Sequence, residues 1–161
     1  MPSKTHRGPD LPDPDDAARA PPHLILELLT AFYWFDEGLQ NYLRAQGWPA
    51  VSRPESMLMA NVVMGCHRPS DIARRLGVSR QAIHATIGQM VGKGVLKLAD
   101  DPSDGRIKVV ELTPVGEAMR KDAQAAMRIM VDELGRRIGA KRVERLREAM
   151  LTDWGDPLAF A

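Results

Sequence analysis

Three polar side chains near the middle of the chain have the types and spacing needed to read DNA bases. Arg80, Gln81 and His84 open a segment, 79–91, whose other side carries apolar residues at helical spacing. Those apolar residues are Ile83, Ile87, Met90 and Val91. Arginine can bind guanine, glutamine can pair with adenine, and histidine can donate to either base. The segment is therefore predicted to be a helix with a buried stripe and an open face of hydrogen-bond donors.

Two serines lie where helices are expected to begin. Ser70 and Ser79 are predicted N-caps, and the free N–H groups at such helix ends bind phosphate. Gly77, between them, permits the left-handed turn that ends the shorter helix. Gly88, on the open face, would let the second helix approach a groove closely. This order of elements predicts a helix-turn-helix.

Two β-branched runs, 95–99 and 107–112, follow this unit and predict a β-hairpin. The intervening DDPSDGR contains strong turn signals, so we expect a loop of about seven residues. Arg106 at its tip suits a narrow and negative minor groove. Lys97 and Lys108 are placed to flank it on phosphates.

Helices predicted on both sides of this unit must hold it in place. The predicted helices cover 23–46, 54–65, a long segment capped by Thr113, and 140–151. In the first of them nearly every second residue is apolar, which suggests a partner helix. The last is expected to turn Val143, Leu146 and Met150 inward. The predicted fold class is therefore mainly α with a small β-hairpin wing, a winged helix-turn-helix.

Charge is unevenly distributed along the 161 residues, whose net charge is +1. Residues 67–114 carry eight Lys or Arg against five Asp or Glu, whereas residues 23–66 carry two against four. This excess of cations fits an electrostatic footprint for nucleic acid. Residues 1–22 hold six of the 12 prolines and are predicted to form a flexible arm, with 23–161 as a single domain.

Several other classes of function find no support in the sequence. A single cysteine, Cys66, cannot form an internal disulfide, and the scattered histidines predict neither a metal site nor a cofactor. No phosphate-binding loop, H-E-x-x-H or C-x-x-C motif appears, so an enzyme is not expected. No signal peptide is visible and the apolar run 24–35 is too short to span a bilayer, so we expect a cytoplasmic protein without a membrane partner.

The segment from Ser70 to Gly116 resembles the MarR family of multiple-antibiotic-resistance-type regulators. The wing of that family reads D-P-x-D-R-R followed by x-V-x-L-T-x-x-G. The matching residues here are Asp101, Pro102, Asp104, Arg106, Val110, Leu112, Thr113 and Gly116. The runs SDIARRLGVS and KGVL also match, and the helix order extends the resemblance over about 23–152.

This resemblance implies a homodimer held by the N- and C-terminal helices, 23–48 and 114–152, beside a DNA-reading part, 54–113. Helix 79–91 would then lie in the major groove of each half of a pseudo-palindromic operator on double-stranded DNA. Arg106 would enter the minor groove with Asp104 orienting it. Members of the family are typically repressors released by a small aromatic or anionic ligand, or by oxidation, so a ligand-responsive repressor is the expected function.

Two positions depart from the family pattern. Leu98 and Gly105 stand where the family often has arginine. Fewer cations mean fewer phosphate or groove contacts, hence weaker binding or a different sequence preference. The alternative interpretation is therefore a degenerate winged helix that binds a partner protein or a metabolite without specific DNA binding.

Aromatic residues and the cysteine provide two hypotheses for regulation. Candidate contacts for a small-molecule effector are Phe32, Phe35, Trp48 and Met57. Packing in a core or a dimer interface is the alternative for these side chains. Cys66 is a candidate redox sensor because it lies beside His67 and Arg68, cationic neighbours of the kind that activate thiols. An idle thiol is the alternative.

Overall fold

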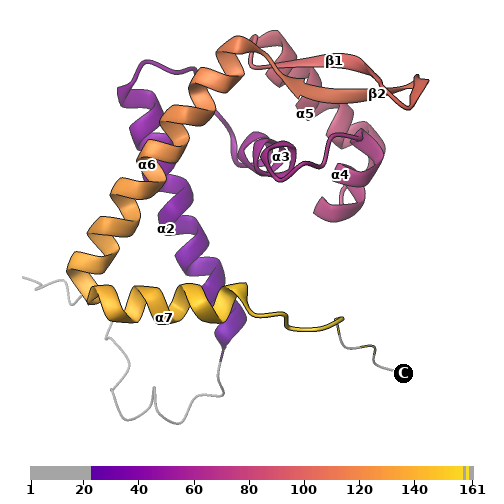
Figure 1. Cartoon of the computed structure of the whole chain (residues 1–161). Helices are drawn as coiled ribbons and strands as arrows, with labels where there is room; N and C mark the ends of the chain where they lie inside the picture. The colour runs from indigo at the N-terminus through magenta and orange to yellow at the C-terminus, as the bar shows by residue number, and fades with distance from the viewer. Residues whose placement is uncertain (1–22, 158, 160–161) are drawn as a thin grey trace, which may run out of the picture. The chain divides into compact units, whose positions relative to one another are not determined.

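The computed structural model describes residues 23–157 and 159, and this part contains six helices and a two-stranded hairpin (Figure 1). The elements are α2 Leu24–Ala45, α3 Arg53–Val63, α4 Pro69–Leu76, α5 Arg80–Gly92, β1 Leu96–Asp101, β2 Asp104–Leu112, α6 Pro114–Ile138 and α7 Ala140–Leu151. The prediction of a mainly α fold with a β-hairpin wing is confirmed. The predicted arm, 1–22, lies outside the described residues. No described helix is both long and apolar enough to cross a membrane.

Contacts divide the chain within α2 into two units, Met1–Tyr33 and Trp34–Ala161. The second unit holds the winged helix and α6 and α7. One apolar core joins α3, α4, α5 and the hairpin to the adjoining ends of α2 and α6. Its buried side chains are Leu43, Leu58, Val62, Ile72, Ala73, Ile83, Ile87, Met90, Val95, Leu96, Val110 and Met119.

Three apolar side chains hold α5 against this core. Ile83, Ile87 and Met90 are each at most 2 % exposed. The prediction that Val91 joins them is wrong, because its side chain is 39 % exposed. Each helical residue advances about 100° round the axis, so Val91 lies one step past Met90 and turns to solvent. The opposite side of α5 stays open.

Two predicted N-caps are confirmed, and they fix the two ends of the reading unit. The Ser79 hydroxyl accepts a hydrogen bond from the Ala82 N–H at 3.1 Å, and the Thr113 hydroxyl accepts one from the Gly116 N–H at 3.0 Å. A Cβ atom on Gly116 would lie only 2.1 Å from the carbonyl oxygen of Val95. Glycine therefore lets α6 begin directly against the hairpin.

The predicted cap at Ser70 is wrong, because α4 begins two residues earlier than expected. Pro69 occupies the first turn and Arg68 is the N-cap residue. The fixed φ and missing N–H of proline suit that first position. Ser70 is exposed inside the first turn, and Gly77 ends α4 with a φ of 65°, as predicted.

The hairpin is longer, and its loop shorter, than predicted. β1 and β2 pair antiparallel up to Asp100 and Lys108, and Asp101 then pairs with Asp104. The turn between the strands is therefore residues 102–103, and the expectation of a seven-residue loop is wrong. The register shifts after Asp100, so three residues of β2 before Lys108 bulge out of the ladder.

α7 has no buried residue among those that the structure describes. Leu146 and Met150, predicted to face inward, are 45 % and 42 % exposed, so that prediction is wrong for a single chain. The prediction rested on the spacing of the apolar residues. Such spacing identifies the apolar face of a helix but does not show whether the same chain or a partner packs against it. An uncovered apolar face of this kind marks an interaction surface.

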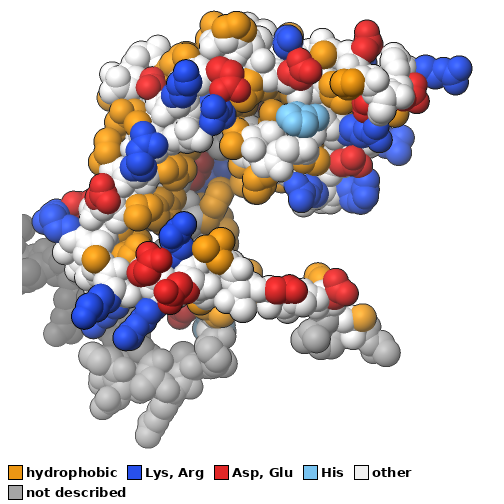
Figure 2. Space-filling view, in the orientation of Figure 1, with side chains coloured by type: hydrophobic (Ala, Val, Ile, Leu, Met, Phe, Trp, Pro, Cys, Tyr) orange, Lys and Arg blue, Asp and Glu red, His pale blue; other side chains and the backbone are white. Residues whose placement is uncertain are grey.

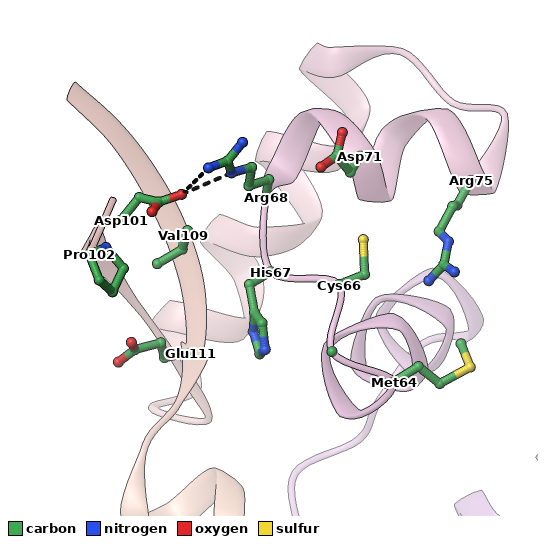
Figure 3. A pocket seen from close by; sticks show the side chains of 11 residues that line it. Met64, Cys66, His67, Arg68, Asp71, Arg75, Asp101, Pro102, Val109 and Glu111 are labelled. Carbon is green, nitrogen blue, oxygen red and sulfur yellow. Dashed lines mark hydrogen bonds and ion pairs between the residues drawn. The ribbon is translucent and has the colours of Figure 1, made fainter. Parts of the chain in front are cut away.

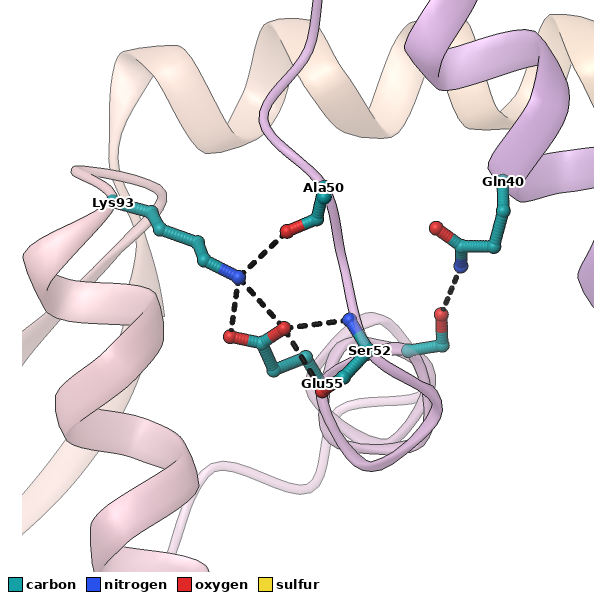
Figure 4. Close-up of polar contacts among 6 residues, drawn as sticks. Gln40, Ala50, Ser52, Glu55 and Lys93 are labelled. Atoms are coloured by element: carbon teal, nitrogen blue, oxygen red, sulfur yellow. Dashed lines mark hydrogen bonds and ion pairs between the residues drawn. The ribbon is translucent and has the colours of Figure 1, made fainter.

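A buried ion pair joins the start of α3 to the end of α5 (Figure 4). Lys93 Nζ lies 2.6 and 2.7 Å from the two carboxylate oxygens of Glu55, and it also donates to the Ala50 carbonyl at 2.7 Å. Glu55, 2 % exposed, accepts from the Ser52 N–H and hydroxyl at 2.7 and 2.9 Å, which closes a capping box. Burial opposes ionisation, but the hydrogen bonds from Lys93 and Ser52 outweigh it, so the pKa of Glu55 lies below its ordinary 4.5.

Removing the cation from this pair should destabilise the fold. We expect Lys93→Met to lower the free energy of unfolding by about 2–4 kcal/mol, because it leaves a buried carboxylate without its partner. Chemical denaturation at neutral pH measures this change. Lys97→Met is the matched control, since Lys97 pairs with Glu111 at the surface (3.0 Å), and it should cost less than about 1 kcal/mol. Equal effects of the two substitutions would contradict the importance of the buried pair.

Candidate nucleic-acid interface

The open face of α5 carries the predicted base-reading side chains. Arg80, Gln81 and His84 are all exposed. Gly88 is exposed too, and a Cβ atom built on it would meet no described atom within 4 Å. The fold therefore does not require glycine at position 88, although alanine would favour the helix by about 1 kcal/mol. The outer face of α5 therefore has no side chain at position 88 and carries hydrogen-bond donors at its N-terminal end.

Free positive charge around this face is scarcer than the sequence suggests. Lys97 pairs with Glu111 at 3.0 Å, and Lys108 pairs with Asp100 across the hairpin. Arg106, by contrast, has no side-chain partner among the described residues. Figure 2 shows Lys and Arg side chains at the tip of the hairpin and over α4. The hairpin thus has a nearly neutral shaft, with Arg106 at its tip as an exposed cation that is not paired with any described side chain.

Asp104 contacts Arg106 through the backbone. Its Oδ1 accepts a hydrogen bond from the Arg106 N–H at 3.0 Å. The guanidinium of Arg106 is left exposed, as a minor-groove contact requires. The bond holds the backbone of the turn, and the role of Asp104 in orienting the Arg106 side chain stays a prediction.

A second carboxylate, Asp101, ties the hairpin tip to the start of α4, and the sequence analysis assigned it no such role (Figure 3). Asp101 Oδ2 accepts a hydrogen bond from Arg68 Nε at 2.8 Å and lies 2.7 Å from Arg68 Nη2 in an ion pair. Its Oδ1 accepts from the Ser103 hydroxyl at 2.6 Å and the Ser103 N–H at 2.9 Å. These bonds to Ser103, and then those to Arg68, lower the pKa of Asp101 from 3.8 to about 2.

Cys66 and His67 lie in the segment that joins α3 to α4 and line a pocket of about 690 Å³ beside this tie (Figure 3). Cys66 is a free, half-buried thiol. His67 Nδ1 hydrogen-bonds to the Val110 carbonyl at 2.9 Å, and the Val110 N–H donates to the His67 carbonyl at 2.8 Å. These two hydrogen bonds join the segment to β2, and the role of Cys66 as a redox sensor stays a prediction.

An apolar cavity of about 530 Å³ lies between α2, α3 and α6. It is lined by Leu39, Leu43, Val51, Ser56, Met59, Ala60, Val63, Met119, Arg120, Ala123, Gln124, Met127 and Arg128. Most of these side chains are apolar, and two are arginines. This combination suits a small apolar molecule that carries a negative charge.

The four aromatic and methionine residues proposed as ligand contacts do not line this cavity in the described part of the chain. Trp48 Nε1 donates to Asp122 at 2.7 Å, which ties the segment after α2 to α6. Phe35 packs edge-on against Trp34, with ring centroids 4.8 Å apart. Met57 is half-buried on α3, and Phe32 lies in the other unit of the chain. The structure gives these residues packing contacts, and their contact with a ligand stays a prediction.

The described residues contain no group of three or more His, Cys, Asp or Glu that could hold a metal ion. The protein presents an open helix face and a charged hairpin tip instead. A short helix, a tight turn, a second, capped helix and a hairpin in this order define a winged helix-turn-helix.

Comparisons with known proteins agree with this class. Residues 52–107 match the model of the MarR family. BldR from Sulfolobus solfataricus has the same fold with a TM-score of 0.58 and 22% identity, over 87% of this chain and 95% of that chain. The multiple antibiotic resistance repressor MarR gives 0.62 and 20% identity, over 83% and 96%. CouR from Rhodococcus jostii RHA1, bound to p-coumaroyl-CoA, gives 0.61 and 16%, over 84% and 96%. No curated protein sequence matches the chain.

The resemblance drawn from the wing motif is thereby confirmed. The segment 52–107 is a winged helix of the MarR family, and the fold of the chain is that of MarR-family transcriptional regulators. Members of this family are transcription regulators rather than enzymes.

The pKa of Asp101 provides a test of the hairpin tip. The ionised carboxylate contributes stability that is fully present above about pH 4 and is lost as the pH falls toward 2, because its folded pKa lies below its ordinary 3.8. We expect Ser103→Ala to raise this pKa, since the Ser103 hydroxyl is the main cause of the shift. Carboxyl ¹³C NMR titration measures it. Ser70→Ala is the control, and an unchanged titration in Ser103→Ala would contradict the geometry.

Proposed function

We propose that the protein is a dimeric, sequence-specific DNA-binding transcriptional regulator, a repressor that a small apolar anion releases from its operator. The observation that carries this proposal is the pairing of an open, donor-bearing face on α5 with an exposed arginine, Arg106, near the end of the hairpin. Arg80, Gln81 and His84 supply base contacts in the major groove, and Arg106 enters the neighbouring minor groove.

A second copy of the chain is the partner that the exposed apolar side chains favour. In the first unit they lie on the early turns of α2: Leu24, Ile25, Leu26, Leu29, Phe32 and Tyr33. In the second unit they lie on α6, α7 and the segment after it: Met127, Ile129, Val131, Ile138, Leu146, Met150, Leu151 and Trp154. Long helices that expose so much apolar surface are typical of chains that associate. We infer that these helices, 23–48 and 114–152, form the dimer and that 54–113 reads DNA.

The cavity between α2, α3 and α6 is the proposed place for the effector. Arg128 lines it and is exposed, with no ion-pair partner among the described residues, whereas Arg120 is paired with Glu117 at 2.8 Å. A carboxylate bound to Arg128 would leave the rest of the molecule against Leu43, Met59 and their neighbours. CouR, whose structure holds an aromatic acyl-CoA, has the same fold, and this supports an aromatic anion as the class of ligand.

The walls of the cavity connect it to α5. Val51 and Ser56 line the cavity and flank the segment that holds the end of α5. In that segment the Ala50 carbonyl and the Glu55 carboxylate both accept hydrogen bonds from Lys93. A ligand that displaces residues 50–56 would therefore move the support of α5, which gives binding a route to operator release.

DNA binding is the first prediction to test. Titration of the protein onto its own upstream DNA should show binding that Arg106→Ala weakens by about ten- to a hundredfold, with a salt slope about one unit smaller. Lys141→Ala on α7 removes the same charge outside the winged helix and should change little. Half-sites should lie about 10–10.5 bp apart. Equal, weak binding to upstream and scrambled DNA would overturn the proposal and favour a winged helix that binds a protein or a metabolite.

The effector site has its own test. We expect benzoate to release the protein from upstream DNA more effectively than benzamide, which has the same shape without the charge. Arg128→Gln should remove this difference while leaving DNA binding without ligand intact. Fluorescence anisotropy with labelled DNA measures both. If neither probe nor larger cinnamates shift the wild-type titration, the assignment of an aromatic anion is wrong.

A further inference from the structure

Arg68, the N-cap residue of α4, is not a residue type that stabilises a helix N-terminus. N-cap positions favour serine, threonine, aspartate and asparagine, whose side chains bind the first free N–H groups. Arg68 occupies this position and gives α4 no side-chain cap in the described structure. Its guanidinium instead turns away from the helix toward the hairpin (Figure 3). The residue type is therefore explained by the hairpin and not by the helix.

The contact between Arg68 and Asp101 restricts the orientation of the two side chains as well as holding them together. Arg68 Nε donates to one oxygen of Asp101 at 2.8 Å, and Nη2 forms an ion pair with the same oxygen at 2.7 Å, while the other oxygen holds the turn through Ser103. Asp101 is 8 % exposed, so water reaches this carboxylate little. A planar guanidinium that directs two nitrogens at this oxygen restricts the angle of the contact more than the ammonium of a lysine would.

The tip of the hairpin lacks regular strand pairing, so a contact with α4 is needed to hold it in position. Its ladder is regular only as far as Asp100 and Lys108, and the residues beyond are bulged. Arg106, the cation at the tip, belongs to this bulged part. Because position 105 is glycine and the two hairpin lysines are paired, the contact of the hairpin with DNA depends on where this one arginine points.

We propose that Arg68 and Asp101 are positioning residues for DNA binding: their paired contact fixes the hairpin tip against α4, so that Arg106 is already directed at the minor groove before DNA arrives. This inference rests on the proposed function. It assigns to Arg68 an indirect role, in which the side chain acts through Asp101 and touches no phosphate itself.

Charge gives the sharpest test of this role. Asp101→Asn removes a negative charge beside the DNA-binding face, so simple electrostatics predicts tighter binding. The positioning role predicts the opposite, weaker binding to upstream DNA by about tenfold. Arg68→Lys keeps the charge but loses the Nε hydrogen bond and the planar guanidinium, and it should weaken binding by a similar factor. Full rescue by lysine, or tighter binding by Asp101→Asn, would overturn the inference.

Coupling to Arg106 separates positioning from general loss of structure. Arg106→Ala should cost about ten- to a hundredfold in the wild type, but less than about threefold in the Asp101→Asn background, since there the arginine is no longer placed. Arg68→Thr provides a variant in which α4 gains a cap while the tie is lost, so its thermal stability should hold as its DNA affinity falls. An undiminished effect of Arg106→Ala in the Asp101→Asn background would overturn the inference.

A measurement without DNA keeps this test independent of the proposed function. ¹⁵N relaxation of the backbone amides of residues 105 and 106 in the free protein should show greater mobility in Asp101→Asn than in the wild type. If the wild type fails to bind upstream DNA specifically, the proposed function is wrong, and the relaxation result still decides whether the tie orders the tip. Unchanged mobility would overturn it.

Discussion

The ion pair between Glu55 and Lys93 is the contact on which the position of α5 depends. One carboxylate caps α3, accepts from Ser52, and holds the lysine that follows the last turn of α5. The apolar contacts of α5 come from a single stripe, because its outer side must stay open for a partner. A helix held on one side by Ile83 and its neighbours can still rotate, and the ion pair fixes its far end.

The segment at the start of α3, residues 52–56, also forms hydrogen bonds with elements outside the winged helix. Gln40 of α2 donates to Ser56 at 2.6 Å, and Arg53 donates to Asp36 at 2.9 Å. Just before it, Trp48 donates to Asp122 of α6. Residues 48–56, which lead into α3, therefore form hydrogen bonds with α2, α6 and the end of α5. Part of this segment also lines the apolar cavity. A change of a few tenths of an ångström there reaches every tied element at once.

Local features of this fold could be predicted from the sequence, and long-range polar pairs could not. Capping by Ser79 and Thr113 and the buried stripe of α5 follow from neighbouring residues, so spacing was sufficient. The partners of Glu55 and Arg68 lie 38 and 33 residues away, and no periodicity links them. One local signal was available, since Ser52 and Glu55 have capping-box spacing. The hairpin loop was predicted too long because Asp, Pro and Gly suggest a loop by composition, whereas side-chain bonds here keep the strands together to the turn.

The cross-strand pairs of Lys97 and Lys108 affect how such a protein would search for its site. Each lysine already has a carboxylate partner on the opposite strand, so approaching DNA gains little from either of them. On the proposed function, counterion release by the hairpin would therefore come mainly from Arg106. The hairpin would add little to sliding along unrelated sequence, and its contribution to residence on DNA would depend on how well this arginine fits the shape of one minor groove.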